Sequence, residues 1–344
     1  MPAFVDGVDR FQRKHSVIGF PLGVVYKFFD DQGPYLAAIL TYYGFIAIFP
    51  ALLLASSILG FVLQGNPDLQ KELLDSALKQ VPIVGTQLGT PEGLTGSKTA
   101  VVVGALAAIY GVLGLGQAGQ HALSTAWGVP RNSRFNPFVG RARSLVSIMI
   151  AGMALLFIAA LPVLATNIGS FTPDARLRWV GTLISIVVTA VVLAWLMGFT
   201  TAHRLPFRSS LPGAVVISVL WHILQAAGNV YVQRVVAKAS QLNGVFALVL
   251  GLIALLYLAA SMAVIGVEVN VVRDRKLYPR ALLTPFTDAV DLTDADRKAY
   301  AMYAKAQRHK GFERVHVTFD GEGSPDSTGR ILLGDSDQER GRAP

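Results

Sequence analysis

The chain has 344 residues, of which 52% are hydrophobic and 15% are charged, and it contains no cysteine. The lack of cysteine excludes disulfides, thiolate metal sites and cysteine nucleophiles. The formal net charge of +8 is compatible with binding nucleic acid. The basic residues lie between apolar segments, however, which indicates that they set the orientation of the chain in a membrane.

Six long stretches contain no Asp, Glu, Lys or Arg at all: 32–67, 99–130, 144–173, 179–203, 209–233 and 239–267. About 20 apolar residues cross the hydrocarbon core of a bilayer. Every backbone polar group must be paired within such a segment, which favours helices. We therefore predict an all-α, polytopic membrane protein with six transmembrane helices at about 36–63, 99–121, 144–165, 179–200, 213–233 and 245–269.

The N-terminal segment, 1–34, mixes apolar and charged residues. It is predicted to be either a helix lying in the headgroup layer or a short cytoplasmic helix packed on the bundle. The transmembrane domain follows over 35–280. Its first span carries Tyr42 and Tyr43, whose hydroxyls are candidates for lining a substrate cavity. It also carries Pro50, which should kink or break the helix. The longest connection, 64–98, is assigned to the outer side.

The second span combines a small-residue stripe with polar residues. Gly104, Gly111 and Gly114 recur at helical spacing, and such small faces allow close helix packing in lipid. Gln117 and His121 lie further along, near the cytoplasmic end. They are candidates for lining a substrate cavity, although polar residues are also tolerated near the interface for structural reasons.

The fifth span carries a row of polar residues. Their spacing of three and four places them on one helix face, with His222 near mid-depth: Ser218, His222, Gln225, Asn229 and Gln233. Polar groups at this depth face the bundle interior or a water-filled cavity. The row predicts a substrate cavity, with His222 as a possible proton relay; the alternative is hydrogen bonding between helices.

The sixth span ends in Gly266-Val267-Glu268-Val269-Asn270, and Glu268 is the only acid between Asp174 and Asp274. An unpartnered carboxylate at this depth takes up a proton or reaches the interface. Arg131 and Arg134 are candidate partners, so we predict a structural ion pair that locks helix ends, with substrate contact as the alternative. Asn270 is placed in the same structural group.

The remaining residues, 281–344, are predicted to form a cytoplasmic tail. Thr293 and Asp296 have the spacing of a capping box, so a short helix is expected over about 294–308. The segment beyond Gly321 is rich in Gly, Ser, Asp and Arg, with little to bury, and is predicted to be disordered.

Basic residues flanking the spans set the predicted orientation. Residues 1–34, the second and fourth connections and the start of the tail, 273–280, carry fourteen Lys and Arg, against seven in the alternate connections. The positive-inside rule then places both termini in the cytoplasm.

Motifs for catalysis are absent from the sequence. It has no Gly-x-x-x-x-Gly-Lys-[Ser/Thr] phosphate loop, no Gly-x-Ser-x-Gly elbow and no His, Asp or Glu cluster with metal-ligand spacing. We therefore predict no catalytic residues, no metal, no cofactor and no enzyme activity.

Several stretches resemble one family of bacterial inner-membrane proteins, the YihY/BrkB family. They are Leu36–Phe45 with Phe49-Pro50, Ala122–Trp127, Leu211–Ala214 with Trp221 and Tyr231-Val232, and Gly266–Asn270, similar to the family's Gly-x-Glu-x-Asn. The resemblance covers roughly 20–280, and departs at Leu242-Asn243-Gly244, where the family usually has Tyr-Gly. It implies six transmembrane helices in the plasma membrane; the family name ribonuclease BN is treated as a mislabel.

Two functions follow as expectations. The first is a transporter or flippase for an amphiphilic, anionic, lipid-like substrate that is not driven by ATP. The second is a non-transporting scaffold for envelope assembly, and a ribonuclease is a distant third. The expected partners are membrane lipids, with envelope proteins or a second copy of the chain as further candidates, and no nucleic acid.

Overall fold

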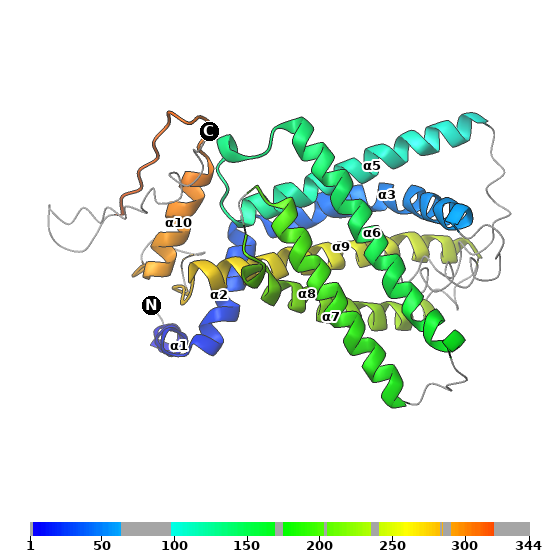
Figure 1. Ribbon diagram of the computed structural model, residues 1–344. Helices are drawn as coiled ribbons and strands as arrows, with labels where there is room; N and C mark the ends of the chain where they lie inside the picture. The colour runs from blue at the N-terminus through cyan, green and yellow to red at the C-terminus, as the bar shows by residue number, and fades with distance from the viewer. Residues whose placement is uncertain are drawn as a thin grey trace, which may run out of the picture.

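The structure is a computed structural model that describes residues 3–62, 98–168, 175–202, 205–234, 241–282, 284 and 290–319. Helices account for all the regular secondary structure in these ranges (Figure 1). Six of them are long: α3 (Gly33–Val62), α5 (Lys98–Ala126), α6 (Pro137–Ile168), α7 (Ala175–Thr200), α8 (Phe207–Arg234) and α9 (Gln241–Arg275). Each contains one of the six predicted spans, apart from a residue at the end of the first.

Four of these helices are long and apolar enough to cross a membrane, counted over the described residues: α6, α7, α8 and α9. Within α3, Gly33–Ile48 forms a shorter apolar helix. The protein is therefore an all-helical membrane protein with several crossings. The full count of six remains a prediction, as does the orientation. The predicted outer loop 64–98, apart from Lys98, and the predicted disordered segment beyond Gly321 lie outside the described residues.

Two prolines lie inside long helices. α3 remains helical on both sides of Pro50, so that proline does not end the helix. α8 begins at Phe207 and continues past Pro212. Pro212 therefore lies inside the helix, where its missing N–H interrupts the hydrogen-bond ladder.

The glycine stripe of α5 packs against α3. A Cβ at Gly111 would lie 2.8 Å from the backbone nitrogen of Ala47, and one at Gly114 would overlap the ring of Tyr43. At these two positions glycine lets α5 approach α3 closely. The surroundings of Gly104 lie outside the described residues.

Three short helices gather at one end of the bundle: α1 (Ala3–Lys14), α2 (Ser16–Asp30) and α10 (Asp294–Ala306) (Figure 1). The chain reverses at two sharp corners, where Gln32 (φ 57°) follows α2 and Lys276 (φ 54°) follows α9. We call α1, α2, residues 277–282 and α10 the clasp. Because both terminal segments enter it, they lie at the same end of the bundle, as an even number of crossings requires.

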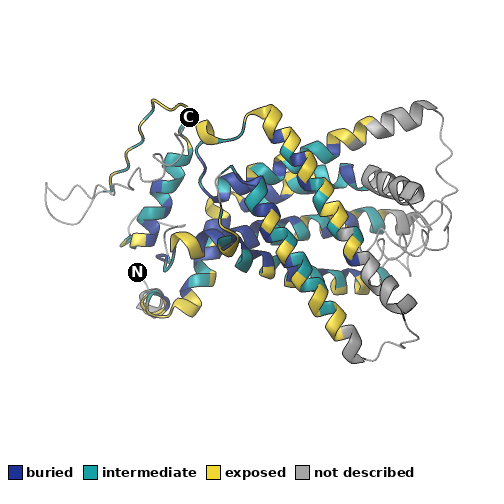
Figure 2. Ribbon diagram, in the orientation of Figure 1, coloured by how far each residue is buried: buried dark blue, intermediate teal, exposed yellow. Residues whose placement is uncertain are grey.

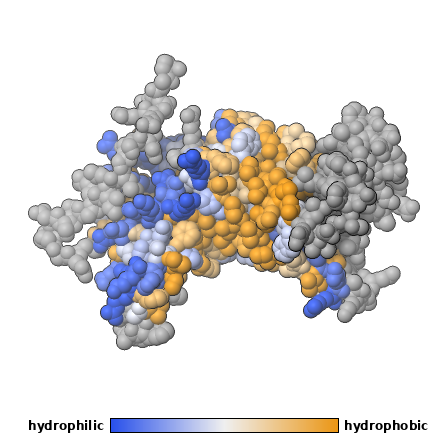
Figure 3. Space-filling view, turned by 60° about the horizontal axis from the view of Figure 1, so that its bottom comes forward, coloured by the Kyte–Doolittle hydropathy of each residue, from blue (hydrophilic) through white to orange (hydrophobic). Residues whose placement is uncertain are grey.

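The remaining bundle surface is strongly apolar. Leu183 and Val187 on α7 are 59% exposed, and Met153 on α6 is 66% exposed. The space-filling view shows an apolar belt across the middle of the molecule, with hydrophilic residues gathered toward the clasp (Figure 3). Exposed apolar area on this scale suits contact with lipid and not with water.

Candidate functional site

A buried lysine lies where the clasp meets the bundle. Lys27 of α2 is fully buried, forms an ion pair with Asp31 one turn later, and has its Nζ 3.6 Å from Oε2 of Glu268 on α9. Nζ also donates to the carbonyl oxygen of Ala126 (3.0 Å) and lies 5.1 Å from the ring centroid of Tyr303. One ammonium therefore joins α2, the α2–α3 corner, α5, α9 and α10. Figure 2 shows the dark-blue buried core of this junction.

Local sequence explains why the lysine can reach this position. Gly19, Gly23 and Lys27 recur every four residues and form one face of α2. A Cβ at Gly23 would lie 3.0 Å from the carbonyl oxygen of Leu277, so glycine lets α2 approach the segment after α9 closely. Ala126 ends α5, where carbonyl groups lack partners within the helix and attract a cation.

The cluster contains two carboxyl groups for one ammonium. Burial raises the pKa of Asp31, and the neighbouring Lys27 opposes that shift. Glu268 is fully buried, and neither of its carboxyl oxygens has a hydrogen-bond partner. The Lys27–Asp31–Glu268 cluster is therefore short of at least one hydrogen-bond donor.

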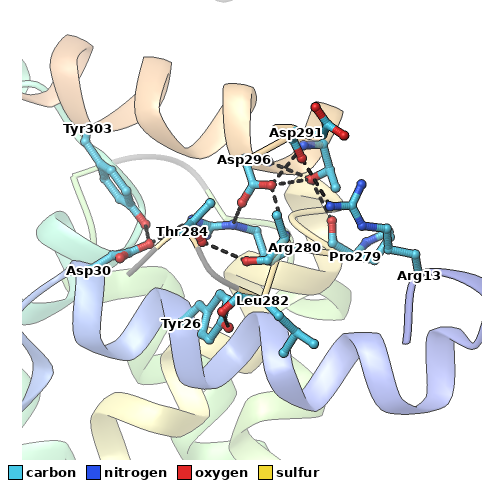
Figure 4. Close-up of polar contacts among 12 residues, drawn as sticks. Arg13, Tyr26, Asp30, Pro279, Arg280, Leu282, Thr284, Asp291, Asp296 and Tyr303 are labelled. Carbon is cyan, nitrogen blue, oxygen red and sulfur yellow. Dashed lines mark hydrogen bonds and ion pairs between the residues drawn. The ribbon is translucent and has the colours of Figure 1, made fainter. Parts of the chain in front are cut away.

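A buried arginine holds the clasp together (Figure 4). The side chain of Arg280 is fully buried and forms ion pairs with Asp30 (3.0 Å) and Asp296. The hydroxyl of Tyr303 donates to Asp30 (3.1 Å), and Nε2 of Gln12 donates to the carbonyl oxygen of Arg280 (2.6 Å). Arg280 thus connects α1, α2 and α10 to the segment that follows α9.

Further contacts complete the clasp. Thr293 and Asp296 form the capping box that their spacing predicts, and Asp296 also accepts from the backbone N–H of Ala281 (3.0 Å). The hydroxyl of Tyr26 donates to the carbonyl oxygen of Leu282, and burial raises the pKa of Tyr26 to about 12. The first and last described parts of the chain therefore form one polar network.

The crossing of α8 and α9 is built by two of the motifs noted in the sequence. A Cβ at Gly213 would overlap the carbonyl oxygen of Gly266, so these helices meet backbone to backbone. Asn270 accepts from the N–H of Gly213 (2.6 Å) and donates to the carbonyl oxygen of Ser210 (3.0 Å). Its amide thus bonds backbone groups on both sides of Pro212.

The polar row on α8 runs from the interior to the surface. Ser218 is fully buried and donates to Ala214, and His222 is half-buried with Nδ1 2.8 Å from the carbonyl oxygen of Ser218. Gln225 is also half-buried, whereas Asn229 and Gln233 are exposed. The row therefore opens onto the bundle surface along its second half.

The polar residues of α5 occupy a separate place. Gln117 and His121 are exposed, and Nδ1 of His121 lies 3.0 Å from Nη1 of Arg134. The α8 row packs with α7 and α9, whereas α5 packs mainly on α3 and α6. The structure therefore does not bring the two polar sets together.

Tyr42 and Tyr43 form an aromatic group with Tyr110 of α5. The ring centroids are 5.1 Å apart between Tyr42 and Tyr43, and 5.8 Å apart between Tyr43 and Tyr110. Tyr42 and Tyr110 are more than half exposed. These hydroxyls therefore lie at the bundle surface, between α3 and α5.

The ion pair of Glu268 differs from the sequence expectation. Its partner is Lys27, whereas Arg131 contacts His309 (3.1 Å) and Arg134 contacts His121. Sequence reasoning counted Lys27 and Arg280 as topological charges and assigned no role to Asp31. The signal was present: a lysine and an aspartate at i,i+4 directly before an apolar span are spaced for pairing.

The comparisons with known proteins agree with the motifs that build these contacts. No curated protein and no solved structure matches the chain. One family model does match, over residues 24–288, a range that includes Lys27, the α8–α9 crossing and Arg280. This match covers well over half of the chain, and the protein accordingly belongs to the Virulence factor BrkB family.

Proposed function

We propose that this protein is a transporter or flippase that moves an amphiphilic, anionic, lipid-like molecule across the membrane without ATP. The observation that supports it most is the graded polar row on α8, from buried Ser218 to exposed Gln233. Polar side chains on the surface of a spanning helix are costly against hydrocarbon. They are accommodated where a headgroup or water passes beside them, with the acyl chains left in lipid.

The surroundings of the row fit an amphiphile. Ile223 and Val230 lie on the same helix and are 56% and 49% exposed. A polar strip beside exposed apolar residues offers one surface to a headgroup and another to its chains. A soluble substrate would have no use for the second surface.

The experiment is reconstitution of the full chain in vesicles with labelled phospholipids of several classes. The wild type should exchange lipid between leaflets faster than protein-free vesicles. A variant with His222, Gln225 and Asn229 changed to Leu should fall to the protein-free rate. Its matched control changes three exposed apolar residues of the same helix to Leu: Val219, Ile223 and Val230. Exchange no faster than in empty vesicles, for every lipid class, would sink the proposal.

A scaffold for envelope assembly is the second candidate, and the clasp favours it. Hydrophilic residues gather at the clasp end of the bundle, where a protein partner could bind (Figure 3). On this reading the triple Leu variant keeps cellular function, while loss of the connection 64–98 or of the clasp surface abolishes it. Transport predicts that the triple variant fails in cells.

A further inference from the structure

The junction between the clasp and the bundle carries a feature that neither structural packing nor the α8 row accounts for. Five groups converge there from different segments: the Lys27 ammonium, the Asp31 and Glu268 carboxyls, the Tyr303 ring and the Ala126 carbonyl. The next charged neighbours, Asp30 and Arg280, are already paired with each other. The space is closed, since Lys27, Asp31 and Glu268 are at most 6% exposed.

The charges in this space do not balance. If both carboxyls are ionised, they contribute two negative charges against one positive charge from Lys27. Arg280 does not correct the difference, because Asp30 and Asp296 together outweigh it. A net charge buried away from water is strongly disfavoured, and two carboxyls in one site normally hold a proton between them.

The hydrogen bonds show the same deficit. Lys27 donates to Asp31 and to the Ala126 carbonyl, and its distance of 3.6 Å to Glu268 is beyond a hydrogen bond. Both oxygens of Glu268 are buried without a partner. The Asp31 and Glu268 carboxyls both approach the Lys27 ammonium, which places them in one closed site. One added proton would make either acid a donor to the other.

We propose that Lys27, Asp31 and Glu268 form a proton-binding site in which the two carboxyls share one proton at neutral pH. The proton adds to a carboxylate oxygen of the pair, no covalent bond to carbon changes, and the three groups become neutral overall. Burial raises the pKa of Asp31 in the direction that this sharing requires. The proton-binding site is inferred from its own contacts and burial. Its use to couple proton movement to transport rests on the proposed function.

The site lies where a change of charge would have mechanical consequences. Glu268 is two residues from Asn270, which fixes the α8–α9 crossing, and Gly266 forms that crossing. Lys27 and Asp31 belong to the α2 end that Arg280 ties to α10. Losing the proton leaves a net negative charge between the clasp and α9, and so favours their separation.

The test is infrared spectroscopy of the full-length protein in lipid at neutral pH. A shared proton gives a carboxylic acid C=O band that Asp31→Asn and Glu268→Gln each remove completely. Each single change leaves one carboxyl group beside the Lys27 ammonium. That carboxyl group then loses its proton and pairs with Lys27. The control, Glu313→Gln, alters an acid in the tail outside the cluster and should keep the band.

The unmutated protein provides a second measurement if a variant does not fold. Incorporating isotope-labelled aspartate should shift the band, and so should isotope-labelled glutamate. A wild type without the band, a band that survives either substitution, or a band moved by only one label would overturn the shared site. Lipid exchange is not involved in this readout, so failure of the proton site and failure of transport are separately visible.

Discussion

At the residue scale, the protein buries a small set of ionisable side chains away from water. Lys27, Glu268 and Arg280 are fully buried, and each contacts at least one oppositely charged group. Such pairs add little net stability over well-packed apolar residues, but removing one partner is costly because the other charge is stranded. Their value is specificity, because each pair fixes which helix ends meet.

Asp31→Asn should change how stability depends on pH. Burial raises the pKa of Asp31 above its ordinary value, so the folded protein binds this proton more tightly than the unfolded chain. The wild type therefore loses stability as pH rises from the ordinary Asp range, about 3.9, through the raised pKa. In Asp31→Asn this loss is absent, so its Tm relative to wild type should rise with pH.

Thermal unfolding in one lipid or detergent across the pH range provides the check. Asp291→Asn, which changes an exposed carboxyl, is the control and should follow the wild-type curve. Parallel curves for Asp31→Asn and wild type would contradict the interpretation.

Arg280→Ala should destabilise the clasp by about 3–5 kcal/mol, the usual cost of stranding buried partners. Asp30 and Asp296 would lose their shared cation, and the contacts from Gln12 and Tyr303 would weaken with them. Hydrogen exchange or limited proteolysis of α10 measures the loosening. Arg275→Ala, at an exposed position nearby, should stay within about 0.5 kcal/mol of wild type; an equal effect there would remove the special role of Arg280.

At the element scale, glycine decides which helices touch. α5 meets α3 at Gly111 and Gly114, and α8 meets α9 at Gly213 and Gly266. No hydrophobic effect drives helix association within lipid, so close packing and hydrogen bonds must do so. The Asn270 bonds to α8 depend on that close approach.

Gly213→Ala should destabilise the bundle by about 1–3 kcal/mol, as overpacking does. The added methyl would overlap the carbonyl oxygen of Gly266 and crowd the Asn270 amide, 2.6 Å away. Gly181→Ala on α7 is the matched control, because a methyl there meets nothing within 4 Å. Since alanine favours helix by up to about 1 kcal/mol over glycine, the control should be neutral or stabilising. Thermal unfolding distinguishes the two, and loss of stability in both would point to a general intolerance.

The sequence predicts the helices well and their contacts less well. Long uncharged stretches locate the elements, because a bilayer requires length and apolarity of each segment separately. The glycine stripe of α5 can also be predicted from the sequence, since Gly111 and Gly114 follow helical spacing. The pairing of Lys27 with Glu268 could not be predicted in this way, because the two residues are far apart in the chain. The sharp corner at Gln32, next to Asp31, has no strong sequence signal either.

The α8 row shows a second limit. Spacing alone places the polar residues from Ser218 to Gln233 on one face of a helix. It predicts the direction in which these side chains point, but not what they contact. Whether the face meets a neighbour depends on where that neighbour lies. α9 packs on Leu224 and accepts a hydrogen bond from Tyr231, whereas Asn229 and Gln233 are left exposed.

At the scale of the whole molecule, an apolar belt crosses the middle of the face seen in Figure 3, and the clasp lies at one end of the bundle (Figure 1). α2 contributes to both parts. It packs inward through Gly23, Val24 and Lys27, and exposes a second apolar stripe through Ile18, Val25 and Phe29. One face of α2 therefore contacts the bundle, and the other presents apolar side chains of the kind that suit a lipid interface.

Water access along α8 tests whether the molecule offers a polar path through this belt. The chain contains no cysteine, so an introduced cysteine is its sole thiol. In lipid vesicles, Asn229→Cys and Gln233→Cys should react with a water-soluble thiol reagent. Ile223→Cys, on the same helix and 56% exposed, should not, since lipid covers it. If Asn229→Cys and Ile223→Cys are equally unreactive, hydrocarbon covers the polar row as well. The path then has no water in it, and a headgroup could not follow α8 between the leaflets.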